Sequence, residues 1–124
     1  MNIKIDTKEK FTVINIQETI LTANMTAQIE NLAIYKTKNV PHLIVQMQQV
    51  LDIDTAAAQV MYKIQQDFYA SNFSFVVCQL QPNVIAVFEK QDLLDTMNIT
   101  PTESEAWDIV QMEEIERELM RDFD

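Results

Sequence analysis

The first twenty residues alternate between apolar and polar positions. Ile3 and Ile5 have polar neighbours and are followed by a charged segment at residues 8–10. Phe11 and Val13 then continue the same pattern. A period of two is typical of strands that bury one face, and a short polar segment between two such runs is typical of a turn. The N-terminal pattern therefore predicts a β-hairpin.

The period becomes helical in the next segment. Met25, Ile29 and Leu32 recur at a spacing of three or four residues, which predicts an amphipathic helix. Thr22 or Asn24 can cap its start, because a side-chain oxygen at this position accepts a hydrogen bond from a free backbone amide. The second predicted element is therefore a helix with one apolar face.

Two short apolar runs enclose a further helical segment. They cover residues 42–47 and 73–78, and their β-branched composition is typical of buried central strands. Between them, Val60, Ile64 and Phe68 recur at helical spacing. This order predicts a β-α-β unit with two parallel strands.

The order of predicted elements is ββαβαβαβα. Strands that alternate with helices after a hairpin favour an α/β fold, a mixed β-sheet with helices packed on it. The length fits one domain over residues 1–124. After the hairpin we expect helices over residues 24–36, from 55 to about 71, from Pro82 onward and over 102–124, and strands over 42–47, 73–78 and at Ile99.

Charge and composition restrict the classes of partner. The chain has 19 acidic and 9 basic residues, a formal net charge of −10, whereas nucleic-acid binding relies on clustered Lys and Arg. It contains no glycine, which argues against glycine-rich phosphate-binding loops. No apolar run approaches the roughly 20 residues of a membrane-spanning helix, and the N-terminus does not resemble a secretory signal. We therefore expect a cytoplasmic protein that binds neither nucleic acid nor membrane.

Few residues are suited to catalysis or metal binding. Cys78 stands in an apolar run, which is typical of a buried, inert thiol. His42 has no histidine, cysteine or carboxylate cluster nearby, so we expect an ordinary residue at a strand edge. A run of glutamates in the last helix is expected to be a solvated face. We predict no enzyme activity, no metal and no cofactor. The glutamates are Glu113, Glu114, Glu116 and Glu118.

The apolar residues of the acidic C-terminal helix, residues 102–124, fall on two faces when placed at about 100° per residue. We expect one set to pack on the sheet and the other to form an interface with another molecule or, as a homodimer, with a second copy. An alternative is that the first helix covers the second set within the monomer. The first set is Ala106, Ile109 and Val110, and the second is Met112, Ile115, Leu119 and Phe123.

Three motifs occur along the chain. Residues 53–57 are Ile-Asp-Thr-Ala-Ala, residues 80–84 are Leu-Gln-Pro-Asn-Val, and an acidic helix follows Thr100. They resemble, in turn, the Asp-Ser-Ser-Gly turn, the Leu-x-Pro-x-Val motif and the C-terminal helix of a small stand-alone subgroup of the STAS family, which includes the anti-sigma factor antagonists. The resemblance spans nearly the whole chain and implies a STAS-like fold.

In that family a kinase that is also the anti-sigma factor phosphorylates the hydroxyl after the aspartate, and this modification releases the partner. The resemblance implies that Thr55 is the phosphoacceptor and that the partner is a protein such as an anti-sigma factor or a Ser/Thr kinase. A phosphate at a helix start would add about −1.5 to −2 charges and repel a docked partner. The residues expected to contact the partner are Thr22, Asn24, Asp52, Asp54, Gln59, Tyr62 and Lys63.

Two alternatives remain open. Asp54 or Thr55 can serve only as a helix cap, which contributes typically about 1 kcal/mol of stability. The protein can also be an unregulated scaffold that self-associates through its C-terminal helix. The leading hypothesis is a non-enzymatic regulatory module that switches between protein partners.

Overall fold

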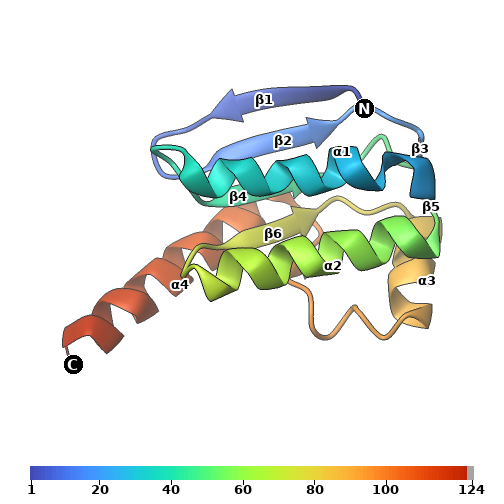
Figure 1. The fold of residues 1–124 in the computed structure, drawn as a ribbon. Coiled ribbons are helices and arrows are strands. Elements are labelled where there is room, and N and C mark those ends of the chain that lie inside the picture. The colour runs from blue at the N-terminus through green and yellow to red at the C-terminus, as the bar shows by residue number, and fades with distance from the viewer. Residues whose placement is uncertain (123–124) are drawn as a thin grey trace.

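A mixed five-stranded sheet lies at the centre of the protein, whose computed structural model describes residues 1–122 (Figure 1). The strand order is β1-β2-β4-β6-β7. β1 and β2 are antiparallel, and each of the other neighbouring pairs is parallel. The predicted mixed sheet is therefore confirmed. The strands are β1 (Ile3–Thr7), β2 (Thr12–Ile16), β4 (Leu43–Gln46), β6 (Phe75–Cys78) and β7 (Ile99–Thr100).

Helices cover both faces of this sheet. Figure 1 shows α1 and α2 on one face, α4 on the opposite face, and α3 at one end of the molecule. The predicted alternation of helices with strands is confirmed. The helical segments are η1 (Ala23–Met25), α1 (Thr26–Glu30), η2 (Asn31–Thr37), α2 (Thr55–Ala70), α3 (Pro82–Lys90) and α4 (Glu103–Asp122).

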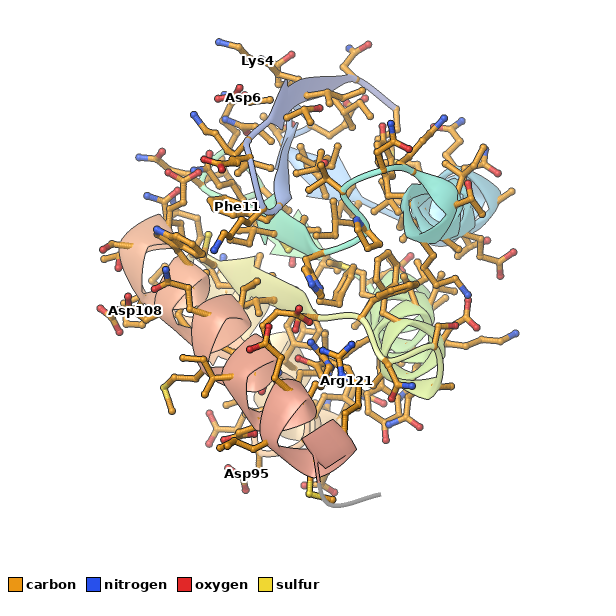
Figure 2. The ribbon with its side chains drawn as sticks, turned by 90° about the vertical axis from the view of Figure 1, so that its left-hand side faces the viewer. Lys4, Asp6, Phe11, Asp95, Asp108 and Arg121 are labelled. Atoms are coloured by element: carbon orange, nitrogen blue, oxygen red, sulfur yellow. The ribbon has the colours of Figure 1, made fainter. Side chains whose placement is uncertain are left out.

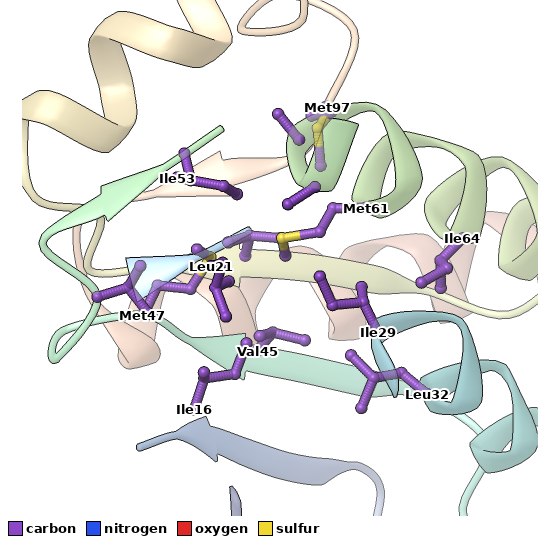
Figure 3. Packing of buried hydrophobic residues seen from close by; sticks show 14 of the residues in the cluster. Ile16, Leu21, Ile29, Leu32, Val45, Met47, Ile53, Met61, Ile64 and Met97 are labelled. Carbon is purple, nitrogen blue, oxygen red and sulfur yellow. The ribbon is translucent and has the colours of Figure 1, made fainter. Parts of the chain in front are cut away.

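The central strands divide their side chains between two hydrophobic cores. In β4, Leu43 and Val45 belong to the core beneath α1 and α2, whereas Ile44 belongs to the core beneath α4. A strand buried on both faces shows a continuous apolar run instead of an alternation. Figure 3 shows the first of these cores, to which α1 contributes Ile29 and α2 contributes Met61.

Two very short strands were not predicted. β3 (Ile20–Leu21) and β5 (Asp52–Ile53) pair in parallel and form a separate small sheet. Leu21 and Ile53 are buried in the core. Two residues are too few to show a period, so the pattern alone could not reveal them. This pair brings the segment before η1 alongside the segment before α2.

The predicted first helix is not one regular α-helix, because 3-10 turns flank a short α-helical centre. The hydroxyl of Thr26 donates to the carbonyl oxygen of Ala23 at 3.0 Å. The hydroxyl of Thr37 donates to the carbonyl oxygen of Ile34 at 2.6 Å. Local bonds between side chain and backbone compete with the regular α-helical ladder. They favour tight turns at both ends of this segment.

Two helices end on a left-handed residue although the chain has no glycine. Asn72 follows α2 with φ 65°, and Asp92 follows α3 with φ 56°. In each case the next amide, that of Phe73 or Leu93, donates to a carbonyl oxygen of the last helical turn at 2.9 Å. Asn and Asp tolerate this conformation better than most other residues. The helices therefore end sharply without glycine.

The first half of α4 packs on the sheet. Thr102 caps the helix, because its Oγ1 accepts a hydrogen bond from the Glu105 amide at 3.1 Å. Ala106 and Val110 are buried in the second core. Figure 2 shows the length of α4, with Asp108 on its outer side. The expected packing of the first apolar set on the sheet is thus confirmed.

His42, which we expected to be an ordinary residue at a strand edge, is part of a polar network with α4. The imidazole is buried, and its Nδ1 accepts a hydrogen bond from the Ser74 amide at 3.0 Å. Its Nε2 lies 3.1 Å from Oε1 of Glu114, and the same oxygen lies 2.9 Å from Nη1 of Arg117. His42 and Glu114 are far apart in the sequence, so the contact depends on α4 crossing the sheet.

This network predicts a pH-dependent stability. Burial lowers the pKa of His42 below its usual 6.5, an effect that Glu114 and Glu113 oppose and Arg117 reinforces. The folded protein therefore binds this proton more weakly than the unfolded chain does. The stability that neutral His42 contributes is complete above about pH 6.5 and declines as the pH falls below it.

We expect the free energy of unfolding of the wild type to fall, relative to that of His42→Asn, as the pH drops from about 7 to about 5. The amide oxygen of asparagine can replace Nδ1 as the acceptor for the Ser74 amide. Urea denaturation at a series of pH values measures the difference. An identical pH dependence in the two proteins would contradict this assignment.

Candidate functional site

One carboxylate joins the starts of two helical segments. Asp54 is the N-cap of α2, and its Oδ1 accepts a hydrogen bond from the Ala57 amide at 2.9 Å. Its Oδ2 accepts a second bond from the Ala23 amide, the first residue of η1, at 2.7 Å. Asp54 is one of the two residues proposed from the sequence as the cap. It also performs the capping that we expected from Thr22 or Asn24.

Thr55 is exposed at the first position of α2, next to this cap. The hydroxyl of Thr55 is not the capping group, because both capping bonds are accepted by Asp54. Asp52 is also exposed, and its Oδ1 accepts a bond from the Ile53 amide at 2.9 Å. The turn therefore presents one exposed hydroxyl directly after two acidic residues, at the positive end of a helix dipole.

The structure brings the predicted residues of the two helix starts together. Thr22 is half-buried at the start of η1 and makes no side-chain capping bond, and Asn24 is exposed beside it. The bond from Ala23 to Asp54 holds this segment against the turn that carries Thr55. Residues predicted from two separate parts of the sequence thus lie at one end of the molecule. They are Thr22, Asn24, Asp54 and Thr55.

The other predicted contact residues lie farther along α2. Gln59, Tyr62 and Lys63 line a shallow hollow of about 420 Å³ together with Glu30 of α1. Gln59 is held toward α3, since its Nε2 donates to Oε1 of Gln91 at 3.1 Å. The candidate surface therefore extends from the turn along α2.

Sequence reasoning missed two exposed aliphatic residues beside the turn. Ile20 is 51% exposed and stands opposite Asp52 in the β3–β5 pair. Leu51 is 55% exposed, and its amide donates to the carbonyl oxygen of Thr19 at 2.8 Å. The available signal was that Leu51 directly follows the apolar Val50, and adjacent residues of an extended segment face opposite sides. This signal needed the unpredicted strand pair for its interpretation.

The second apolar set of α4 is exposed where the structure describes it. Met112, Ile115 and Leu119 are each more than half exposed, while Phe123 lies outside the described residues. The alternative that the first helix covers this set is wrong, because α1 packs on the opposite face of the sheet (Figure 1). In Figure 1 the C-terminal half of α4 lies at the other end of the molecule from the start of α2.

Cys78 is not suited to act as a nucleophile. It is buried in the second core, as expected, and burial raises the pKa of its thiol to about 12. A thiol that stays protonated at neutral pH is a poor nucleophile. Within residues 1–122, no helix combines the length and the apolar character needed to span a membrane.

Comparison with known proteins agrees with this architecture. The family model of the STAS domain matches residues 2–106, and the chain belongs to this family. No curated protein matches the sequence. The region matched includes β1 to β7, the turn at Thr55 and the first residues of α4.

Several solved structures share the fold at low sequence identity. A variant of RsbS from Moorella thermoacetica has a TM-score of 0.73 at 18% identity, covering 90% of this chain and 96% of that one. An anti-sigma factor antagonist from Mycobacterium paratuberculosis has a TM-score of 0.72 at 12% identity, covering 89% and 93%. The anti-sigma factor antagonist SpoIIAA, in its unphosphorylated form, has a TM-score of 0.70 at 18% identity, covering 89% and 96%. The STAS-like fold is therefore confirmed.

The hydrogen bonds of Asp54 predict unequal effects of two neighbouring substitutions. Asp54→Ala removes both bonds, and we expect it to lower the free energy of unfolding by about 1 to 2 kcal/mol. Thr55→Ala removes no capping bond, and we expect a change within about 0.5 kcal/mol. Urea denaturation of the two variants provides the comparison. Equal destabilisation would show that Thr55 shares the structural role.

Proposed function

We propose that the protein is a non-enzymatic regulatory module that binds a protein partner around the start of α2, and that phosphorylation of Thr55 releases this partner. The observation that carries the proposal is the division of roles within the turn. Asp54 supplies the structural bonds, whereas Thr55 is exposed and takes no part in them. Thr55 can therefore be modified without loss of the cap.

A phosphate on Thr55 would alter the charge of this surface strongly. It adds about −1.5 to −2 charges beside the carboxylates of Asp52 and Asp54. The dipole and free amides at the start of α2 favour a negative group there, so the helix tolerates the modification. A partner with groups matched to the neutral hydroxyl meets repulsion instead. The expected consequence is dissociation without unfolding.

The surface around the turn has the chemistry of a protein interface. Ile20 and Leu51 are exposed aliphatic side chains on paired segments next to Asp52. Apolar side chains inside a polar surround supply much of the binding energy in protein interfaces, and charges set the orientation. This mixture supports a protein partner that packs closely on the two aliphatic side chains and on the unmodified turn, where an added phosphate would lie between the two surfaces.

The family supports a choice among partners. SpoIIAA, whose unphosphorylated form has this fold, is an anti-sigma factor antagonist. The carry-over of that role to this chain is an analogy that rests on the fold and on the position of Thr55. On this basis we propose an anti-sigma factor or a Ser/Thr kinase as the partner.

The test compares wild-type protein with Thr55→Ala and Thr55→Glu. Each is incubated with candidate kinases and ATP, and intact mass is measured. We expect the gain of one phosphate in the wild type and none in Thr55→Ala. Binding to the same candidates, measured by titration calorimetry, should be retained in Thr55→Ala and weakened at least about tenfold in Thr55→Glu.

Thr7→Glu is the matched control, because Thr7 is also exposed but lies in β1, outside the turn. It adds the same charge and should bind as the wild type does. Phosphate gain that persists in Thr55→Ala would refute the phosphoacceptor assignment. Equal affinity of Thr55→Glu and wild type would refute charge-driven release.

A further inference from the structure

An apolar stripe runs along the outer side of α4. We call Met112, Ile115 and Leu119 the α4 stripe, and they are 59%, 58% and 54% exposed. Their spacing of three and then four residues places them on one helical face. The buried residues Ala106 and Val110 lie on a different face, against the sheet. The stripe is therefore not required for packing within the described part of the chain.

The stripe continues into a groove beside α4. Ile115 and Trp107 line it from the helix, and Val40 and Pro41 line it from the segment before β4. Its volume is about 560 Å³. A partner helix that lies on the stripe can therefore insert a side chain next to α4. Stripe and groove meet at Ile115, and the groove combines these apolar residues with charged ones, among them Glu118.

Acidic residues flank the stripe on both sides. Glu116 and Glu118 are both exposed. Glu116 directly follows Ile115 of the stripe, and Glu118 directly precedes Leu119 of the stripe. With Met112 and Leu119 one heptad apart and Ile115 between them, these glutamates occupy the flanking positions that face a partner helix. Neither is engaged by the ion pairs that hold His42 and Arg117.

The acidic residues beside the stripe determine which kind of partner helix can bind it. In an antiparallel pair of identical α4 helices, equivalent flanking positions face each other, so Glu116 and Glu118 meet glutamates of the other copy, which is unfavourable. Lysine or arginine at the matching positions of another helix gives attraction instead. Residues 101–124 are rich in acidic side chains throughout, and this strengthens the same preference.

We propose that the α4 stripe is a second docking surface, which binds a basic amphipathic helix of another protein. Apolar residues of that helix cover the stripe, and its Lys or Arg residues meet Glu116 and Glu118. The surface lies at the opposite end of the molecule from the start of α2 (Figure 1). It extends beyond residue 106, where the match to the family model ends. The chain can thus hold two proteins at once, independently of the proposed switch.

Two synthetic helical peptides test this surface. Both carry the same leucine and isoleucine heptad pattern, and one has Lys and the other Glu at the flanking positions. We expect only the basic peptide to bind the full-length protein in fluorescence anisotropy, with an affinity that falls as salt is raised. Failure of the basic peptide to bind, or equal binding of both peptides, would refute the proposal.

Matched variants locate the binding. Ile115→Asp should lower the affinity for the basic peptide at least about tenfold. Ile34→Asp should leave this affinity unchanged, because Ile34 is similarly exposed but lies in η2 on the other face. Glu118→Lys should lower the affinity for the basic peptide more than Glu89→Lys does, although Glu89→Lys makes the same charge change on α3. Equal losses within either pair would mean that binding is not at the stripe.

Sedimentation equilibrium tests the competing occupant. We expect a monomer for the wild type, and a dimer that Ile115→Asp dissociates would assign the stripe to a second copy and overturn the proposal. Thr55→Glu should bind the basic peptide with unchanged affinity. Loss of switching at Thr55 and loss of peptide binding at Ile115 are therefore separate results.

Discussion

The carboxylate of Asp54 is the contact on which the candidate switch surface depends. One of its oxygens satisfies an amide at the start of α2, and the other satisfies the Ala23 amide at the start of η1. Free amides at helix starts are costly to leave unpaired when they are shielded from water. A single side chain thus fixes two segments that are distant in sequence. The hydroxyl of Thr55 is therefore not needed for capping, because the adjacent Asp54 already caps both helix starts.

Periodicity predicted most of the fold because most elements are long enough to repeat. The hairpin and helix α2 each show their period over several residues, and the buried strand β4 shows a continuous apolar run. β3 and β5 contain two residues each and show none, so the register that places Ile20 beside Asp52 could not be predicted. The contact of His42 with Glu114 was hidden for a different reason, since it arises only when α4 crosses the sheet.

Sequence predicted the parts of the candidate site that are formed by neighbouring residues. It could not predict the contacts between segments that are distant in sequence. Asp54 and Thr55 are neighbours in sequence, and a helix start after an aspartate and a threonine has a recognisable pattern. Sequence could not tell which of the two caps the helix, because either side chain is able to do so. The bond to Ala23 resolves this, since one carboxylate has two oxygens and serves both helix starts.

The two proposed surfaces can act independently because α2 separates them. Thr55 begins this helix, and Tyr69 near its end shares a groove with Glu113 and Arg121 of α4. A helix of 16 residues spans about 24 Å at about 1.5 Å per residue. Charges at physiological ionic strength are screened over about 8 Å. A phosphate on Thr55 therefore exerts little direct electrostatic effect at the α4 stripe, and any coupling between the two partners must pass through movement of α2 or α4.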